Sequence, residues 1–538
     1  MPANALHPAQ TALAALWHAA GLPAQALACA HLPGCDPVLP ASFDVASVAQ
    51  ASLGAAALAA AELGHQRGAA RQQVSVDRQH ATLECTGHFA INGRLPDLWD
   101  KLSGLYRCGG AVGQPGFVRI HANFAHPRDG ALRLLGLPPG PSTERAAVTA
   151  ALASWPAEAF EQAAAENGLV VAAARTFEQW DAHPQGLALA GQPLVSITPI
   201  NLEPIRPGTG AAHAPSAPGW MPLAPGWAPA ALRWAPDAGK RPDRPGTAPD
   251  QRPLAGLRVL DLTRILAGPV AGRCLAAYGA DVMLVNAPHL PNIEAIADTS
   301  RGKLSTLIDL RGAAGRAQLM ALADGAHVFL QGYRPGALAR RGFSAQALAA
   351  RCPGIVVASL SAYGATGPWA GRRGFDSLVQ TATGFNLAEG QASGSGVPTA
   401  LPMQILDYAA GHLLAFGISA ALWRQATQGG SWQVAVSLAG VGLWLRSLGR
   451  VATRSAAQSA AQSAAGAQGG AAGKVSAPTR PAIEPWLDET ACGFGDAGQP
   501  GGMATLRAVR HAAQFSATPA RWVRPSMPPG SHPPVWPP

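Results

Sequence analysis

The stretch that decides the fold is PLAGLRVLDLTRILAGPVAGRCLAAYGADVMLV, residues 253–285. Within it, LRVLDLT (257–263) is a short apolar segment of the kind that forms buried strands. GPVAGRCLAAYG (268–279) follows with helical spacing and ends in a glycine, and ADVMLV (280–285) is a second apolar segment. The order strand, helix, strand predicts a β-α-β unit with parallel strands.

The same alternation continues along the chain. GAHVFLQG (325–332) and GIVVASLSAYG (354–364) supply further strands, with helices expected at 315–324 and 344–352. We therefore expect an α/β protein with a doubly wound parallel sheet in its C-terminal half. A dinucleotide site is not expected, because the first turn reads LAGPVAG instead of G-x-G-x-x-G and the second strand ends in Asn286 instead of a ribose-binding acid.

Composition narrows the possible classes of protein. The 538 residues leave room for several domains, and 48% hydrophobic against 13% charged residues excludes wholesale disorder. The net charge of +9 is spread over single arginines, with no run of five basic residues. This distribution suits a phosphate-bearing small molecule, and we expect no nucleic-acid partner.

The cysteines and the apolar stretches bear on the compartment. The seven cysteines contain no C-x-x-C pair, which predicts neither a metal site nor a disulfide framework. The apolar stretch 11–30 has no basic residue before it, since the first is Arg67, so a secretory signal is not expected. The longest uncharged helical run, 408–423, is shorter than the ~20 residues of a membrane span. The sequence predicts a cytoplasmic protein with no membrane anchor and no metal.

Two breaks divide the chain. Residues 207–252 are saturated with Pro, Gly and Ala and predict a linker, and residues 452–478 are of low complexity. The predicted parts are therefore an N-terminal region (1–206), the sheet region (253–451) and a Pro-rich C-terminal tail (479–538).

The N-terminal region contains a faint echo of the sheet region. Residues 51–76 align without a gap under residues 411–436 at a shift of 360, and both predict a small-residue helix followed by a strand. The same shift places Ser47 opposite Asp407.

Asp407 is the one charged residue in LPMQILDYAAGHLLAFGISAALW (401–423). A carboxylate at this place either caps the helix, which stabilises it by about 1 kcal/mol, or acts as a nucleophile in a poorly hydrated site. Asp376, in GRRGFDSLVQ (371–380), presents a similar choice, since it can cap the helix SLVQTATG that follows it. The residues alone leave both roles open.

Five segments, in this order, resemble the class III CoA-transferase family, which includes formyl-CoA transferase, carnitine CoA-transferase and α-methylacyl-CoA racemase. They are residues 253–285, GKLSTLIDLRGAAGR (302–316), YRPGALARRGF (333–343), YGATGPWAGRRGFDSLVQTATG (363–384) and LDYAAGHLLAFGISAALWRQATQGGSWQVAVSL (406–438). The N-terminal region resembles the latter half of the same fold, including its small domain. The halves therefore occur in reversed order, or the chain is a truncated duplication.

The resemblance implies a function and a set of site residues. Asp407 falls on the family's nucleophile, which moves CoA from an acyl-CoA thioester to a carboxylic acid through an aspartyl anhydride and an aspartyl-CoA thioester. Acyl-CoA is then a substrate, and no cofactor is permanently bound. The residues implied to line the CoA site are Ala267, Ile308, Arg311, Tyr333, Ala337, Arg340 and Arg373, of which the arginines meet phosphates.

Alternatives remain within the family. In its racemases the carboxylate matching Asp376 works with a histidine about thirty residues earlier, but no histidine lies between His327 and His412. Transfer is therefore expected ahead of racemisation or isomerisation, with Asp376 positioning the acceptor or polarising the anhydride.

The acid missing at Ser47 in the echo and the unusual order of the parts also leave a non-catalytic CoA-ester-binding or assembly subunit as an alternative. Asn286, Ala287 and Gly332 depart from the family pattern where contacts to the adenine are expected.

The resemblance also implies a homodimer, because family members interlock two chains as rings. The spacings Gly411/Ala415 and Gly417/Ala421 allow close helix contact, which favours such pairing.

Overall fold

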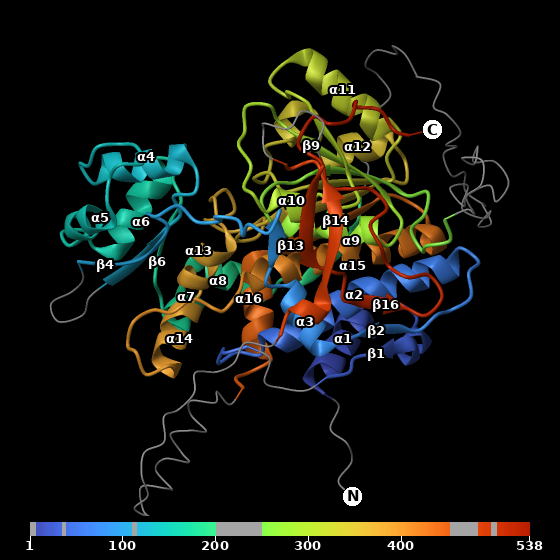
Figure 1. Cartoon of the computed structure of the whole chain (residues 1–538), viewed down its shortest axis with the longest axis horizontal. Helices are drawn as coiled ribbons and strands as arrows, with labels where there is room; N and C mark the ends of the chain where they lie inside the picture. The colour runs from blue at the N-terminus through green and yellow to red at the C-terminus, as the bar shows by residue number, and fades with distance from the viewer. Residues whose placement is uncertain are drawn as a thin grey trace, which may run out of the picture.

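The computed structural model describes residues 7–34, 39–109, 116–200, 250–451, 482–495 and 503–537. The predicted low-complexity segment, and the predicted linker up to residue 249, lie outside these residues. A large α/β body carries a smaller lobe at one side (Figure 1).

The body is built on a seven-stranded sheet of order β10-β9-β8-β11-β12-β13-β7. Its parallel strands are β8 (Arg258–Leu262), β9 (Asp281–Asn286), β10 (Leu304–Leu307), β11 (Val328–Gln331), β12 (Val356–Ser361) and β13 (Trp432–Ser437). The predicted doubly wound sheet is confirmed, with its switch point between β8 and β11. The sequence did not predict the antiparallel edge strand β7 (Val195–Pro199), which comes from the N-terminal region.

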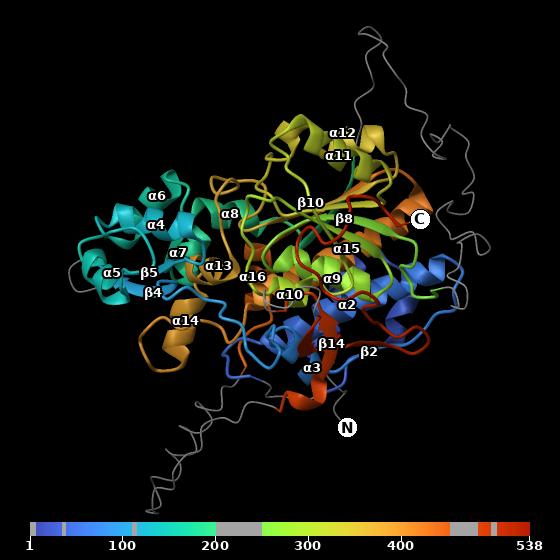
Figure 2. The ribbon, with the colours of Figure 1, turned by 45° about the horizontal axis from the view of Figure 1, so that its top comes forward.

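Alternate residues of the strands face two hydrophobic cores. Val259 of β8 faces the core formed with α9 (Ala267–Ala277) and α15 (Ile405–Gln428). Leu260 faces the core formed with α11 (Ala313–Asp324) and α12 (Ala345–Arg351). Helices therefore cover both faces of the sheet, as Figure 2 shows.

Helix α2 (Val45–Gln66) packs along α15, and the two helices begin 360 positions apart. The helix predicted from the sequence echo is therefore confirmed. Both helices are long and apolar enough to cross a membrane by length and composition, and the apolar window of each is wholly buried inside the protein. The echoed strand β2 (Val74–Val76) does not join the main sheet, because it pairs with β1 (Ala30–His31) and β16 (Ala513–Phe515).

The lobe has a core of its own. The strands β4 (Gly104–Cys108), β5 (Gly116–Ile120) and β6 (Val171–Ala173) form its antiparallel sheet, covered by α4 (Ala125–Leu134), α5 (Arg145–Leu152) and α6 (Ala157–Glu166). Strands β5 and β6 contact α13 (Asp376–Ala382) of the body. The remaining helices are α1 (Pro8–Ala19), α3 (Arg78–Glu84), α7 (Phe177–Ala182), α8 (Pro184–Ala190), α10 (Ile296–Thr299), α14 (Phe385–Ala392) and α16 (Leu438–Ser447).

The part of the Pro-rich C-terminal tail that the structure describes contains strands that the sequence analysis did not predict. This part contains β14 (Leu487–Cys492), β15 (Ala504–Val509) and β16. β15 pairs with β3 (Phe89–Ile91), and β16 pairs with β2. The reason is local: residues 503–516 contain no proline, and apolar side chains alternate along β15, so this segment can add to a sheet.

A buried charge network joins the three parts of the chain. Glu84, at the end of α3, lies 3.0 Å from His511 Nδ1 and 3.2 Å from Arg273 Nη2, and its other oxygen accepts from the Ala512 N–H at 2.8 Å. Arg273 also pairs with Asp298. Burial alone raises the pKa of the Glu84 carboxyl, but His511 and Arg273 outweigh it and hold that pKa below its ordinary value.

We expect Glu84→Gln to lower the free energy of unfolding at pH 7 by about 3 kcal/mol, because buried Arg273 loses one of its two carboxylate partners and the hydrogen bonds to the carboxylate are weakened. Since folding lowers the pKa of Glu84, this stabilisation is present above the unfolded-state pKa of about 4.3 and is lost as the pH falls below it. Urea denaturation along a descending pH series measures both effects. The control Glu489→Gln removes a carboxylate that is 65% exposed. Equal losses in the two variants would contradict the prediction.

Candidate active site

The start of α15 is capped by a residue from another helix. Gln404, at the N-cap position, makes no side-chain capping bond. Instead, the Asp407 N–H donates to Asp376 Oδ2 at 3.0 Å, and the Leu406 N–H also bonds this carboxylate. The N–H groups that every helix start leaves unsatisfied therefore receive their acceptor from α13.

This arrangement decides between the two roles of Asp407. Its carboxylate has no hydrogen-bond or ion-pair partner among the described residues, and the residue is 8% exposed. Burial, and then the charge of Asp376, raise the pKa of Asp407 well above its ordinary value. Asp407 is thus a poorly hydrated, unpaired carboxylate that solvent still reaches, and it is not a cap.

Asp376 is a cap, but of a different helix from the one predicted. It is the first residue of α13, whose N-cap is Phe375, and its carboxylate points to α15. Its Oδ1 also accepts from Gln380 Nε2 at 2.5 Å. Burial raises the pKa of Asp376 to about 6 against the lowering effect of these hydrogen bonds. Because Asp376 receives hydrogen bonds and Asp407 receives none, Asp376 ionises first, and its charge then opposes ionisation of Asp407.

Helix α9 approaches α15 one turn after Asp407. A Cβ at Gly411 would lie 2.5 Å from the Ala267 carbonyl oxygen, so only glycine permits this contact. A Cβ at Gly417 would lie 2.6 Å from Val434 of the same chain. The small-residue spacings of α15 therefore serve packing within the chain, and they no longer support pairing between two chains.

The seven residues expected at the CoA site all follow carboxyl ends of parallel strands. Ala267 follows β8, Ile308 and Arg311 follow β10, Tyr333, Ala337 and Arg340 follow β11, and Arg373 follows β12. Ala267, Ile308 and Ala337 are buried, whereas the three arginines are exposed. The topology thus brings them to the sheet edge where doubly wound folds bind ligands, and their contact with CoA stays a prediction.

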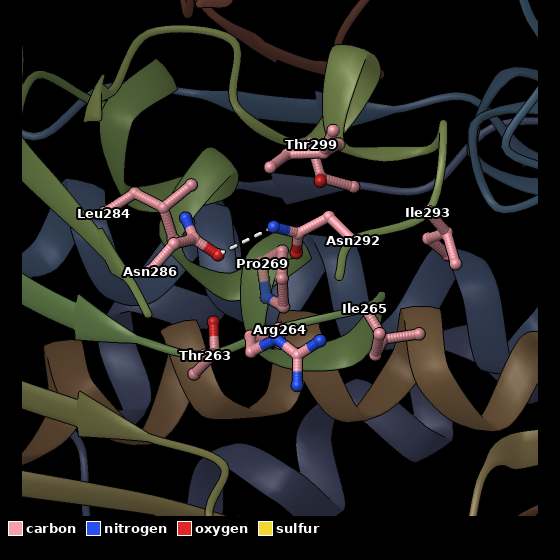
Figure 3. A pocket seen from close by; sticks show the side chains of 10 residues that line it. Thr263, Arg264, Ile265, Pro269, Leu284, Asn286, Asn292, Ile293 and Thr299 are labelled. Carbon is pink, nitrogen blue, oxygen red and sulfur yellow. Dashed lines mark hydrogen bonds between the residues drawn. The ribbon is translucent and has the colours of Figure 1, made fainter. Parts of the chain in front are cut away.

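A hollow of about 230 Å³, partly open to solvent, lies at the ends of β8 and β9 over the start of α9 (Figure 3). In it, Asn292 Nδ2 donates to Asn286 Oδ1 at 3.1 Å. Ile265 adopts φ +77°, a strained conformation for a β-branched residue and one that gathers at functional sites. The lining residues are Thr263, Arg264, Ile265, Pro269, Leu284, Asn286, Asn292, Ile293, Ile296 and Thr299.

Several residues near this edge had no predicted role. Arg264 and Ile265 could have been noticed as the turn LTRIL between strand and helix. From the lobe, the His121 ring stacks on Phe375 at 4.0 Å between centroids, and the charge of Arg119 acts on Asp376. Arg119 and His121 could have been noticed in FVRIHA (117–122), where polar residues alternate with the apolar Val118 and Ile120.

Residues 254–480 match the family model described as CoA-transferase family III. This stretch belongs to that family. The predicted family is thereby confirmed, and the resemblance of residues 1–206 to the latter half of the fold stays a prediction.

Several curated proteins resemble the sheet region. The probable fatty acyl-CoA transferase Rv3272 of Mycobacterium tuberculosis is 35% identical over 37% of this chain and 54% of its own length. The succinate–glutarate CoA-transferase of Agrobacterium fabrum is 33% identical over 32% of this chain and 47% of its own. The formyl-CoA:oxalate CoA-transferase of Rhodopseudomonas palustris is 30% identical over 34% and 46%. The chain thus spans about half the length of these relatives.

Two crystal structures match the same part of the chain. That of Rv3272 is 34% identical with a TM-score of 0.34, covering 37% of this chain and 59% of its own. That of a CAIB/BAIF family protein from Brucella suis is 26% identical with a TM-score of 0.31, covering 40% and 58%. Both TM-scores are low, so family membership rests on the sequence matches.

We expect Asp407→Asn to raise the free energy of unfolding by about 1 to 3 kcal/mol at pH 8, because it removes a buried charge that has no partner. Since folding raises the pKa of Asp407, the wild-type protein loses stability as the pH rises above the unfolded-state value of about 3.9, and the variant does not. The difference between the two proteins therefore grows with pH.

Urea denaturation between pH 4 and pH 8 measures this difference. Asp488→Asn, at an exposed position on β14, serves as the control and is expected to change stability by less than about 0.5 kcal/mol. A loss of stability in Asp407→Asn would show that its carboxylate makes a stabilising contact.

Proposed function

We propose that this protein transfers CoA from an acyl-CoA thioester to a carboxylic acid through covalent intermediates on Asp407. The observation that carries the proposal is the free, poorly hydrated carboxylate of Asp407, whose capping role is taken by Asp376. Membership of residues 254–480 in CoA-transferase family III and the names of the relatives support the same reaction.

In the first half of the reaction, an Asp407 oxygen attacks the thioester carbonyl carbon and the C–S bond breaks. The products are a mixed anhydride on Asp407 and CoA thiolate. The thiolate then attacks the aspartyl carbonyl of the anhydride, which releases the donor acid and leaves Asp407 as a CoA thioester.

In the second half, the acceptor carboxylate attacks the aspartyl thioester and again displaces CoA thiolate, giving a new anhydride. The thiolate attacks the acceptor's carbonyl, so acyl-CoA leaves and the Asp407 carboxylate is restored. Each step consumes one anion and releases another, so no proton has to be transferred. The N–H groups at the start of α15 and the low hydration around Asp407 favour attack by the carboxylate.

In this proposal the carboxyl edge of the sheet binds CoA as a substrate. Arg311, Arg340 and Arg373 supply positive charge to its phosphates, because their guanidinium groups are exposed at that edge. Ala267, Ile308, Tyr333 and Ala337 line the remainder. Asp376 orients the start of α15 and, by its charge, adds to the effect of burial in raising the pKa of Asp407.

One observation favours the alternative within the family, which is racemisation or isomerisation of an acyl-CoA. His121 stacks on Phe375, directly before Asp376, so the fold supplies from the lobe a histidine that the sheet region lacks. Burial lowers the pKa of His121 to about 3, so it is neutral near pH 7. Racemisation needs proton transfer at the carbon next to the thioester, whereas transfer does not.

We further propose that the protein acts as a cytoplasmic homodimer. The family resemblance supports the dimer. For the compartment, the support is that the six cysteines within the described residues are free thiols.

Trapping the intermediate tests the transferase directly. During turnover of acyl-CoA with an acceptor acid, hydroxylamine should convert the activated Asp407 carbonyl into a hydroxamate that peptide mass spectrometry locates. The segment around Ser47 should stay unmodified, because it has no carboxylate at the matching place. Modification at Asp376 alone, or turnover without modification, would falsify the nucleophile assignment.

The same reaction in D2O separates the alternatives. A racemase incorporates deuterium next to the thioester without forming the hydroxamate, and a non-catalytic subunit binds acyl-CoA with neither result. The proposed transferase gives the hydroxamate without deuterium.

We expect Asp376→Asn to shift the acid limb of the kcat/KM profile to lower pH. The charge of Asp376 raises the pKa of Asp407, so its removal lets the nucleophile ionise more readily. The amide oxygen can still accept the Asp407 N–H, so the melting temperature should fall by only a few degrees. An unchanged acid limb in a folded variant would show that Asp407 does not titrate in catalysis.

A further inference from the structure

The lobe presents two polar side chains to the body beside the proposed nucleophile. Val118 and Ile120 of β5 face the lobe's own core. Because strand residues alternate, Arg119 lies on the opposite face, and His121, directly after the strand, continues that face toward α13. His121 stacks on Phe375 with 22° between the rings.

An aromatic residue of the lobe encloses both side chains. The His121 ring meets Trp99 edge-on at 6.1 Å between centroids, and the Arg119 guanidinium carbon lies 5.7 Å from the Trp99 ring centroid. Arg119 is 8% exposed and His121 is 5% exposed.

Neither side chain has a polar partner. Both ring nitrogens of His121 are buried without a hydrogen bond. The Arg119 guanidinium makes no hydrogen bond and no ion pair with any described residue. Burial lowers the pKa of Arg119 to about 10, so it remains a cation at neutral pH. Burying a cation without a hydrogen-bonded anion is unfavourable, so Arg119 remains available to bind an anion that the described chain does not supply.

A comparison within the lobe shows that Arg119 is exceptional. Arg175, which is 4% exposed, binds both oxygens of Glu161, at 3.0 and 2.5 Å. Among the buried charged side chains of the described part, only Arg119 and Asp407 lack a hydrogen-bonded or ion-paired partner. Asp376 interacts electrostatically with both of them.

Asp376 does not serve as the missing anion. Its oxygens already accept from the start of α15 and from Gln380, and it forms no ion pair with Arg119. Arg119 influences the pKa of Asp376, but it is not among the groups that shift the pKa of Asp407.

We propose that Arg119 and His121 bind the non-reacting carboxylate of a dicarboxylic substrate while its other carboxyl group reacts at Asp407. This inference rests on the proposed function. A guanidinium offers two parallel N–H donors to a carboxylate, and a neutral imidazole adds a third. The same site holds the free carboxylate of the donor acyl group, because both half-reactions occur at Asp407.

Isothermal titration tests the inference without turnover. The probes are malonate, succinate, glutarate and adipate, each with the monocarboxylate of equal chain length. At least one dicarboxylate should bind about tenfold more tightly than its matched monocarboxylate. Arg119→Gln should reduce this preference to less than twofold, and His121→Leu should reduce it by about threefold. Arg133→Gln, which alters an exposed arginine on α4, should leave it unchanged.

Each contrary outcome overturns the inference. The inference is wrong if the wild-type protein shows no preference for dicarboxylates, or if Arg119→Gln keeps that preference. Weaker CoA binding in Arg119→Gln, with dicarboxylate binding intact, would assign Arg119 to a phosphate of CoA. If Arg119→Gln does not fold, Arg119→Lys decides: it keeps the charge but not the paired donors, so the preference should fall several-fold, and an unchanged preference contradicts the inference.

The two proposals fail separately. A protein that prefers dicarboxylates in the titration but moves no CoA contradicts the proposed transferase and leaves the binding site standing. A protein that moves CoA equally well to succinate and to butyrate, with no binding preference, contradicts this inference alone.

Discussion

The hydrogen bond from the Asp407 N–H to Asp376 is the constraint on which the site depends. Helix α15 begins inside the core, where its first N–H groups need an acceptor and water cannot supply one. Asp376 meets that need from α13, at 3.0 Å, and so fixes the two helices to each other. Because β5 and β6 of the lobe contact α13, the same carboxylate also sets where the lobe lies relative to Asp407.

The paired helix α2 shows the other solution to the same requirement. Asp44 stands at its N-cap and accepts from the Ser47 N–H at 2.9 Å, and Arg78 pairs with Asp44 at 2.7 Å. In α2 the acid, Asp44, thus precedes the helix, and its carboxylate is occupied by the cap and by the ion pair with Arg78. In α15 the acid lies three residues later, and the cap comes from outside the helix. The two helices, of 22 and 24 residues, begin at matching positions of the sequence echo, yet only α15 keeps an unpaired carboxylate.

The sequence predicted those helices and strands that a local pattern of residues determines. The parallel strands β8, β9, β11 and β12 were predicted because each is an apolar run next to a glycine, whereas the short parallel strand β10 was not predicted. Strand β13 and helix α2 were predicted from the sequence echo, because the small residues of α2 repeat those of α15. Strand β7 was missed because its partner β13 lies far away in the chain, and β14–β16 were missed because they lie in a Pro-rich part of the sequence. Asp407 was identified, but its freedom from capping depends on a contact with a residue 31 positions earlier. Arg119 reaches the site across more than 250 residues of chain, which no spacing reveals.

The distribution of buried charge separates scaffold from site. Lys303 pairs with Asp261 at 2.9 Å, and Arg273 pairs with Glu84 and Asp298, so these charges are compensated within the fold. The uncompensated ones, Asp407 when ionised and Arg119, have opposite sign, and both interact electrostatically with Asp376. A substrate that brings an electrophilic carbonyl to the first and a carboxylate to the second relieves both desolvation penalties at once. The buried charges that lack a partner in the fold thus belong to the proposed substrate site. Because these charges have opposite sign, the substrate binds in one orientation.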